Sequence, residues 1–275
     1  MIRIRKIAFK SSLNPAMVAA ALAALALAGC DGGKIGWRHD PTPDSEHPGP
    51  LASYLKPPRV LAAARQADGV SLVGEAEPKA SVRLGAPTGE ALTGQADDTG
   101  HWRLLVPPAA EPRLYGLSMT LDGRTVQAQG YVMITPEGRA VLLRAGAGAE
   151  VLAAASPSPH ILAVDYDHSG GGVISGVGAP GAGLGVRVDR TTRAEGKVEE
   201  DGRFTLSLSQ ALAPGPRTIQ VSGEGGEQQI VVDVIPPQPP AGGPMRATAT
   251  PIGWRVDWMT PGGGVQTTQL LDNAR

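Results

Sequence analysis

One stretch of the sequence occurs twice, and this internal repeat limits the possible folds more than any other feature. The first copy covers residues 70–106 and the second covers residues 172–208, at a constant shift of 102 residues without a gap. Glycine and apolar positions coincide between the copies. The matched pairs include Gly74 with Gly176, Gly100 with Gly202, and Trp102 with Phe204. Because a repeated segment of this kind is a structural unit, we expect two similar domains in tandem.

Apolar residues recur at every second position inside each copy. Trp102, Leu104 and Val106 do so at the end of the first copy. Side chains on a β-strand point alternately to its two faces, so this spacing predicts half-buried strands. Asp-Gly turns separate the strands, with Gly100 in the first copy and Gly202 in the second. Glycine accepts the positive φ that tight hairpins require, and the repeat therefore predicts hairpins rather than helices.

The two copies resemble the bacterial Ig-like domains of surface and periplasmic proteins. Such domains read roughly as a strand, a Gly-x-Ala-x-Pro-Gly-Ala-x-Val-x-Val segment, a variable hairpin, and an Ala-Asp-x-x-Gly-x-Trp/Phe segment that opens the next strand. The second copy has GAPGA at residues 178–182, whereas the first has EAEPKA at residues 75–80 and lacks both glycines. The resemblance implies an all-β fold with two tandem Ig-like β-sandwich domains. It implies no particular function, because such domains carry many unrelated roles.

The chain divides into five expected segments. They are a lipoprotein signal peptide (1–29), a flexible Pro-rich tether (30–58), Ig-like domain 1 (59–153), Ig-like domain 2 (159–236), and a Pro/Gly linker with a C-terminal β-hairpin (237–275). Domain 1 is expected to hold about seven strands, enough for a two-sheet sandwich. The small-residue stretch 145–155 reads either as a last strand with a linker or as a short helix at 149–154.

The C-terminal hairpin carries two tryptophans, Trp254 and Trp258, on the same face of one strand. An isolated two-stranded hairpin is marginally stable in water. We therefore expect it to dock on a sheet of this chain or of another. The two rings are interpreted either as the buried face of the hairpin or as a platform that contacts a ligand such as a sugar.

The N-terminus reads as an export signal with a lipid attachment site. Four basic residues precede an apolar stretch from Met17 to Ala28, which is too short for a retained membrane span. The sequence Leu-Ala-Gly-Cys that ends at Cys30 resembles a bacterial lipobox. This resemblance implies cleavage before Cys30, acylation with fatty acids such as palmitate, and a membrane anchor on the periplasmic side. Asp31 resembles a signal for retention in the inner membrane, but the choice between the inner and outer membrane stays open.

Composition narrows the possible partners. Cys30 is the only cysteine, so the mature domains hold no disulfide within the chain and depend on core packing. Removal of residues 1–29 takes away four positive charges and leaves 21 basic and 26 acidic residues. This acidic balance argues against nucleic acid and anionic headgroups as main partners.

No catalytic or metal motif stands out, and we predict a protein without catalytic residues, metal or cofactor. Asp165 and Asp167 precede three glycines, but two carboxylates are fewer than a Ca²⁺ site needs, and we interpret them as solvated turn residues. We therefore expect a non-enzymatic binding or scaffold module of the cell envelope, with an envelope protein or polysaccharide as partner. The alternative is a module that binds peptidoglycan or exopolysaccharide through Trp254 and Trp258.

Overall fold

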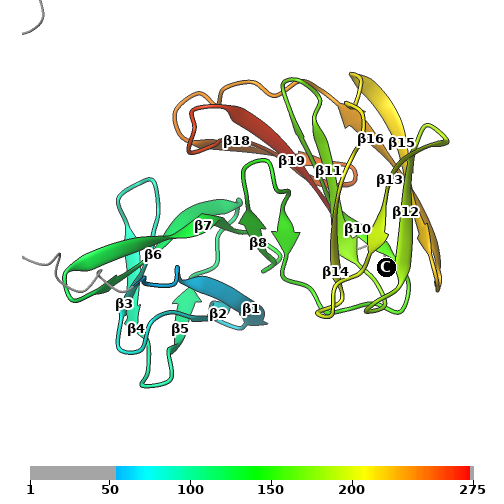
Figure 1. Cartoon of the computed structure of the whole chain (residues 1–275). Coiled ribbons are helices and arrows are strands. Elements are labelled where there is room, and N and C mark those ends of the chain that lie inside the picture. The colour runs from blue at the N-terminus through cyan, green and yellow to red at the C-terminus, as the bar shows by residue number, and fades with distance from the viewer. Residues whose placement is uncertain (1–53, 273–275) are drawn as a thin grey trace, which may run out of the picture. The chain divides into compact units, whose positions relative to one another are not determined.

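The computed structural model describes residues 54–272, and within this range the chain forms nineteen β-strands and no helix (Figure 1). Cys30 and the signal peptide lie outside the described residues. No helix in the described part is long and apolar enough to cross a membrane. The all-β prediction is confirmed. The strands are β1 (Arg59–Gln66), β2 (Gly69–Glu75), β3 (Ser81–Gly85), β4 (Ala91–Gln95), β5 (His101–Val106), β6 (Arg113–Leu121), β7 (Arg124–Ile134), β8 (Ala140–Leu143), β9 (Glu150–Val151), β10 (His160–Asp167), β11 (Gly172–Val177), β12 (Gly183–Val188), β13 (Thr191–Lys197), β14 (Arg203–Ser207), β15 (Gly215–Gly223), β16 (Gly226–Val234), β17 (Met245–Thr250), β18 (Gly253–Met259) and β19 (Val265–Leu271).

The repeat is longer in the structure than in the sequence comparison. β6 and β7 begin 102 residues before β15 and β16, so the duplicated unit has seven strands, β1–β7 and β10–β16. Each copy forms one three-stranded and one four-stranded array of the same order: β1-β2-β5 and β4-β3-β6-β7 in the first copy, β10-β11-β14 and β13-β12-β15-β16 in the second. The first strand of each copy also carries a bulge at the same place, Leu61 in β1 and Leu162 in β10. The expectation of two β-sandwiches is confirmed.

The two copies are extended by different strands. In the first copy β8 and β9 continue the four-stranded array, which gives a six-stranded sheet of order β4-β3-β6-β7-β8-β9. In the second copy β19, β18 and β17 continue the three-stranded array beyond β10, which gives the order β14-β11-β10-β19-β18-β17. The C-terminal hairpin docks on a sheet, as expected, and of the two alternatives the sheet belongs to its own chain. A third strand, β17, which the sequence did not indicate, joins it. Stretch 145–155 contains β9 and no helix.

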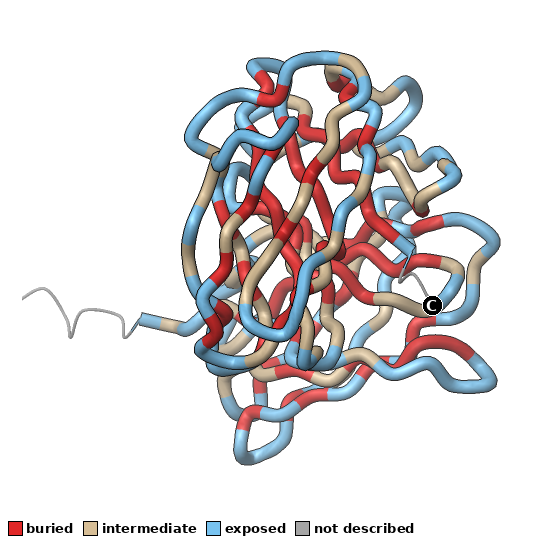
Figure 2. The backbone as a smooth tube through the Cα atoms, turned by 90° about the vertical axis from the view of Figure 1, so that its right-hand side faces the viewer, coloured by how far each residue is buried: buried red, intermediate tan, exposed pale blue. Residues whose placement is uncertain are grey.

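Four sheets lie against one another through three apolar cores. We call them sheet A (β1, β2, β5), sheet B (β3, β4 and β6–β9), sheet C (β10, β11, β14 and β17–β19) and sheet D (β12, β13, β15, β16). The first core lies between sheets A and B and contains Leu72 and Trp102. The middle core lies between sheets B and C, and the last core, with Tyr166 and Phe204, lies between sheets C and D. Figure 2 shows the buried residues concentrated toward the interior of the described chain.

A matched glycine explains why the repeat keeps its pattern. Gly74 lies directly opposite Trp102 in the ladder of β2 and β5, and Gly176 lies directly opposite Phe204 in the ladder of β11 and β14. A Cβ atom at either glycine would collide with the facing ring and with a carbonyl oxygen of the neighbouring strand. Glycine at this position therefore makes room for the large aromatic side chain that fills each core.

Candidate binding surfaces

The structure places Trp258 in the middle core rather than on a surface. Its side chain is 0 % exposed, its Nε1 donates a hydrogen bond to Thr268 Oγ1 at 3.1 Å, and its ring meets Tyr131 edge to face at 6.0 Å between centroids. A ring enclosed in this way offers no face to a sugar. The suggestion that Trp258 contacts a ligand is therefore wrong, and the alternative of a buried hairpin face is right for this residue.

Trp254 is half-buried and packs at the edge of the same core. Its Nε1 donates a hydrogen bond to Glu137 Oε1 at 3.3 Å, in the turn between β7 and β8. Trp258 is enclosed, and Trp254 is held by its hydrogen bond to Glu137. The two tryptophans therefore do not form the exposed stacking platform that the carbohydrate alternative requires.

Asp165 departs from the expectation of a solvated turn residue. Its side chain is 1 % exposed and accepts hydrogen bonds from Ala149 N, Thr268 Oγ1 and Gln266 Nε2 at 2.7, 2.5 and 3.2 Å. Burial raises the pKa of Asp165 to about 6, and the three hydrogen bonds oppose this rise. Ser175 donates to the carbonyl oxygen of Ala149, so Asp165 and its neighbours join the end of the first copy to sheet C.

Asp257 is the second buried carboxylate, and it lies on the opposite face of sheet C. It accepts hydrogen bonds from Thr267 Oγ1 at 2.6 Å, Arg246 at 2.7 Å and Arg255 at 2.9 Å. Burial raises the pKa of Asp257, but these donors outweigh it and hold the pKa below its usual value. Arg255 also reaches Tyr166 and the carbonyl oxygen of Ile235, so the group fastens β18 to the second copy.

The sequence does not indicate that these two carboxylates are buried, because most of the groups that donate hydrogen bonds to each of them are distant in sequence. Residues 160–167 hold one signal: Asp165 lies between Val164 and Tyr166 in a strand that is buried without alternation from residue 161 to residue 166. Within residues 54–272, no three His, Cys, Asp or Glu side chains come together in a way that holds a metal ion. Asp165 and Asp257 act in this structure as hydrogen-bond acceptors that connect strands.

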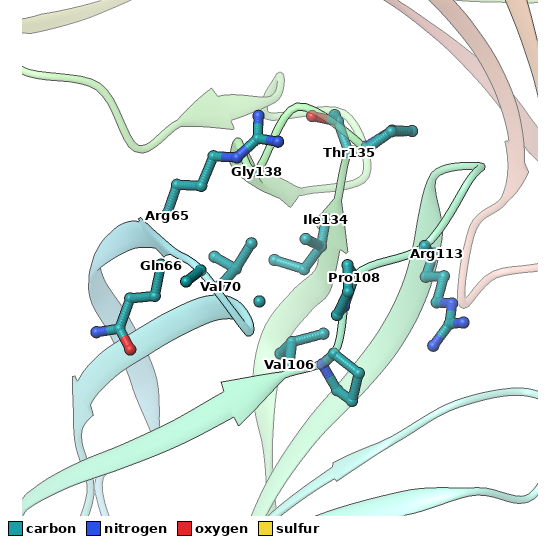
Figure 3. Close-up of a pocket in the computed structure, with 14 residues that line it drawn as sticks. Arg65, Gln66, Val70, Val106, Pro108, Arg113, Ile134, Thr135 and Gly138 are labelled. Carbon is teal, nitrogen blue, oxygen red and sulfur yellow. The ribbon is translucent and has the colours of Figure 1, made fainter.

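A small cavity opens at one end of the first sandwich (Figure 3). Val70, Val106 and Ile134 point into it from sheets A and B, and Arg65 and Gln66 lie at its rim. Its volume of about 70 Å³ admits only a few water molecules. Ligand pockets usually measure about 300–1,000 Å³, so this cavity is too small for a substrate or cofactor.

A larger groove of about 600 Å³ lies beside β1. One wall is the start of β1 with the residues that lead into it, and the floor is the inner face of β7 and β8. The turn before β14, with Asp201 and Arg203, forms its end in the second copy. Two of the large apolar side chains that are exposed on the described chain, Tyr54 (82 %) and Leu61 (37 %), line this groove.

Comparisons with known proteins found similarity to solved structures alone. No family model matches this chain. No curated protein matches it either. Among solved structures, it is similar to the BSP domain of a biofilm-associated protein, with 14 % identity over 65 % of this chain and a TM-score of 0.22. It is also similar to the central fibronectin-III array of RIM-binding protein, with 14 % identity over 80 % of this chain and 91 % of that one, and a TM-score of 0.25. This chain spans 29 % of the first of these structures, and scores this low carry no argument about function.

Proposed function

We propose that this chain is a membrane-anchored lipoprotein of the bacterial cell envelope, on the periplasmic side, in which two fused β-sandwiches act as a non-catalytic binding or scaffold module. The lipobox that ends at Cys30 supports the anchor, and Asp31 favours the inner membrane. The partner is an envelope protein. Trp254 and Trp258 pack in the middle core, so a carbohydrate platform made of these rings is not part of the proposal.

The observation that carries the proposal is the middle core. Interfaces between domains of one chain are often polar and allow relative motion. Here the interface contains Met133, Leu143 and Trp258, all 0 % exposed, and the residues from Tyr54 onward form one compact unit. A scaffold must hold its binding surfaces at fixed positions, and an apolar core between the copies does so.

The anchor is tested by fractionation of bacteria that express the wild-type chain or Cys30→Ser. The wild-type chain is expected to incorporate labelled palmitate and to sediment with membranes, whereas Cys30→Ser is expected to do neither. A Cys30→Ser chain that still partitions with membranes through its N-terminus would contradict the lipid anchor.

The binding role is tested by photo-crosslinking in living cells, with the crosslinker placed at several exposed positions of both copies. We expect a discrete envelope protein to be captured from at least one position. Absence of any specific adduct at all positions would count against a binding module.

A further inference from the structure

We propose that an extended, acidic segment of a partner protein adds to the outer edge of β1 as an antiparallel strand and so completes sheet A. This inference rests on the proposed binding function and names its site. It follows from a comparison of the two copies, from the floor of the groove beside β1, and from the charges around that groove.

The second copy shows what the outer edge of this strand accepts. β10, the counterpart of β1, pairs on its outer edge with β19, in antiparallel register from Ala163 opposite Leu270 to Asp167 opposite Gln266. β1 pairs with β2 alone, and within residues 54–272 no backbone hydrogen bond joins β1 to a further strand. Every second residue of an edge strand turns its N–H and C=O outward, where they are ready to pair with an added strand.

Sheet A is too narrow to cover sheet B. Sheet A has three strands and sheet B has six, and β5 lies against β4 at their shared side. The inner face of β7 and β8 therefore extends past β1. Val132 and Leu142 lie on the floor there, with Leu117 of the adjacent β6, and of these three only Leu142 is left half-buried. A fourth strand beside β1 would cover this apolar surface.

In the second copy the wider sheet is sheet C, and its overhang carries polar side chains. Asp257, Arg255 and Thr267 occupy the face of β18 and β19 that extends past sheet D, and they satisfy one another by hydrogen bonds. Asp257 and Thr267 are buried there, so the second copy fills this place with a hydrogen-bonded polar group, whereas the floor beside β1 includes the half-buried Leu142. Leu61, at the bulge of β1, is 37 % exposed, whereas its counterpart Leu162 is 3 % exposed because it packs in the middle core.

The groove sets the position of the added strand. At one end of β1, Gly138 in the turn between β7 and β8 lies against the side chain of Arg65, which donates a hydrogen bond to the carbonyl oxygen of Glu137 at 3.0 Å. This contact leaves residues 59–64 as the open part of the edge. The groove beside it continues to the second copy at Arg203.

Charge around the groove selects an acidic segment. The basic residues that line it are Lys56, Arg59, Arg144 and Arg203, and the acidic residues are Glu150 and Asp201. Arg59 pairs with Glu75 at 2.7 Å, Arg144 and Arg203 both pair with Glu150, and Arg203 also pairs with Asp201. With Glu75 counted, the surplus is one positive charge, which Lys56 carries. Complementary charge at the rim of an interface raises the rate of association and excludes like-charged partners.

The test measures binding of a fluorescein-labelled peptide to the full mature chain by fluorescence polarisation. The peptide is Asp-Val-Thr-Val-Asp-Val-Thr-Val-Asp, with a second version in which lysine replaces each aspartate. Leu142→Glu puts a charge on the floor of the groove. Val231→Glu is its control, because Val231 is an exposed residue (54 %) on a strand of sheet D. Leu61→Glu provides a second variant at a more exposed position if Leu142→Glu fails to fold.

The acidic peptide is expected to bind the wild-type chain and Val231→Glu within twofold of each other. Leu142→Glu or Leu61→Glu is expected to bind at least tenfold more weakly, and so is the lysine peptide to the wild-type chain. Failure of the acidic peptide to bind, equal binding by the groove variants, or equal binding of the lysine peptide would overturn the proposal. A chain that dimerises through this edge, and becomes monomeric as Leu142→Glu, would also overturn it in favour of self-association.

Hydrogen exchange locates the binding and separates this inference from the broader function. Bound peptide is expected to slow exchange in residues 59–66 and to leave residues 226–234 unchanged. If crosslinking in cells captures a partner only at positions far from β1, the strand addition is wrong while the binding function stands.

Discussion

The two copies of the duplicated unit share their seven strands and differ in what covers the outer edge of the first strand. β10 is buried between β11 and β19, whereas β1 has β2 on one side and a groove on the other. With the same order of strands, the outer edge of the first strand is thus paired in the second copy and unpaired in the first. Duplication therefore accounts for the seven shared strands of each sandwich. The added strands determine which sheet edges and faces are covered within the chain and which stay accessible.

The additions also explain how the copies are joined. β8 and β9 widen sheet B, and β17–β19 widen sheet C, and these two widened sheets pack on each other through the middle core. Asp165, Ser175 and Arg203 add polar contacts between the copies. The interface is therefore built largely from the parts in which the copies differ.

Replacement of Trp258 by alanine is expected to give the largest effect. Removal of a fully buried indole from the middle core should lower the free energy of unfolding by about 3–5 kcal/mol. Trp254→Ala is the matched control, with a smaller loss because Trp254 is half-buried. Denaturant unfolding measures both. A loss below about 1 kcal/mol for Trp258→Ala would show that the middle core does not hold the copies together.

Asp165 should make the joint between the copies sensitive to pH. Its pKa is about 6 in the folded chain and 3.8 in an ordinary setting, so the folded state keeps a proton that the unfolded state releases between these values. The contribution of Asp165 to the free energy of unfolding, about 3 kcal/mol, is therefore fully present below about pH 4 and is lost as pH rises to about 6. Unfolding of wild type and Asp165→Asn from pH 4 to 7 measures this. If both chains have the same pH slope, the carboxyl group of Asp165 is not the cause.

Substitution of the matched glycines Gly74 and Gly176 tests whether the shared strands of the two copies pack in the same way. Gly74→Ala and Gly176→Ala each force a methyl group against an aromatic ring and a carbonyl oxygen, which should cost about 1–3 kcal/mol. The two losses should agree within about 1 kcal/mol, because the surroundings match. Gly183→Ala, with no atom within 4 Å of the added carbon, is the control. A large loss in one copy alone would break the equivalence.

Two neighbouring leucines of β8 lie on opposite faces of sheet B, one covered by the middle core and one open to the groove. Substitution of the leucine on the open face should give the smallest effect. Leu143 is 0 % exposed in the middle core, so Leu143→Ala should cost about 2–5 kcal/mol. Leu142 lines the groove and is half-buried, so Leu142→Ala should cost about 1 kcal/mol or less. Thermal or denaturant unfolding measures the pair. Equal losses would mean that the groove is closed in solution.

The sequence predicted the parts of the fold that depend on local pattern. Alternation and turn glycines indicated the strands of both repeats, and the marginal stability of a lone hairpin indicated that the C-terminal strands must dock. It did not indicate β17, because two of the three apolar residues that alternate in Met245–Thr250 are alanines, and the strand is stabilised by pairing with β18. The pairing of β19 with β10 joins residues about 100 positions apart, and no local pattern records such a contact.

The candidate sites were harder to predict for the same reason. Trp254 and Trp258 alternate as they would on an exposed hairpin, and only the position of sheet B shows that Trp258 is enclosed. Asp165 and Asp257 look like surface acids until their donors arrive from distant strands. The groove beside β1 exists because one copy has a strand that the other lacks, and no local sequence pattern records this difference.

Amide hydrogen exchange of the free chain tests the central difference between the copies most directly. Residues 163–165 of β10 are paired on both sides, and the aligned residues 62–64 of β1 are paired on one side only. We expect the amides of 163–165 to exchange only through large-scale unfolding, and at least one amide of 62–64 to exchange at a nearly unprotected rate. Equal strong protection of both segments would contradict the account, because it would mean that the outer edge of β1 is already paired.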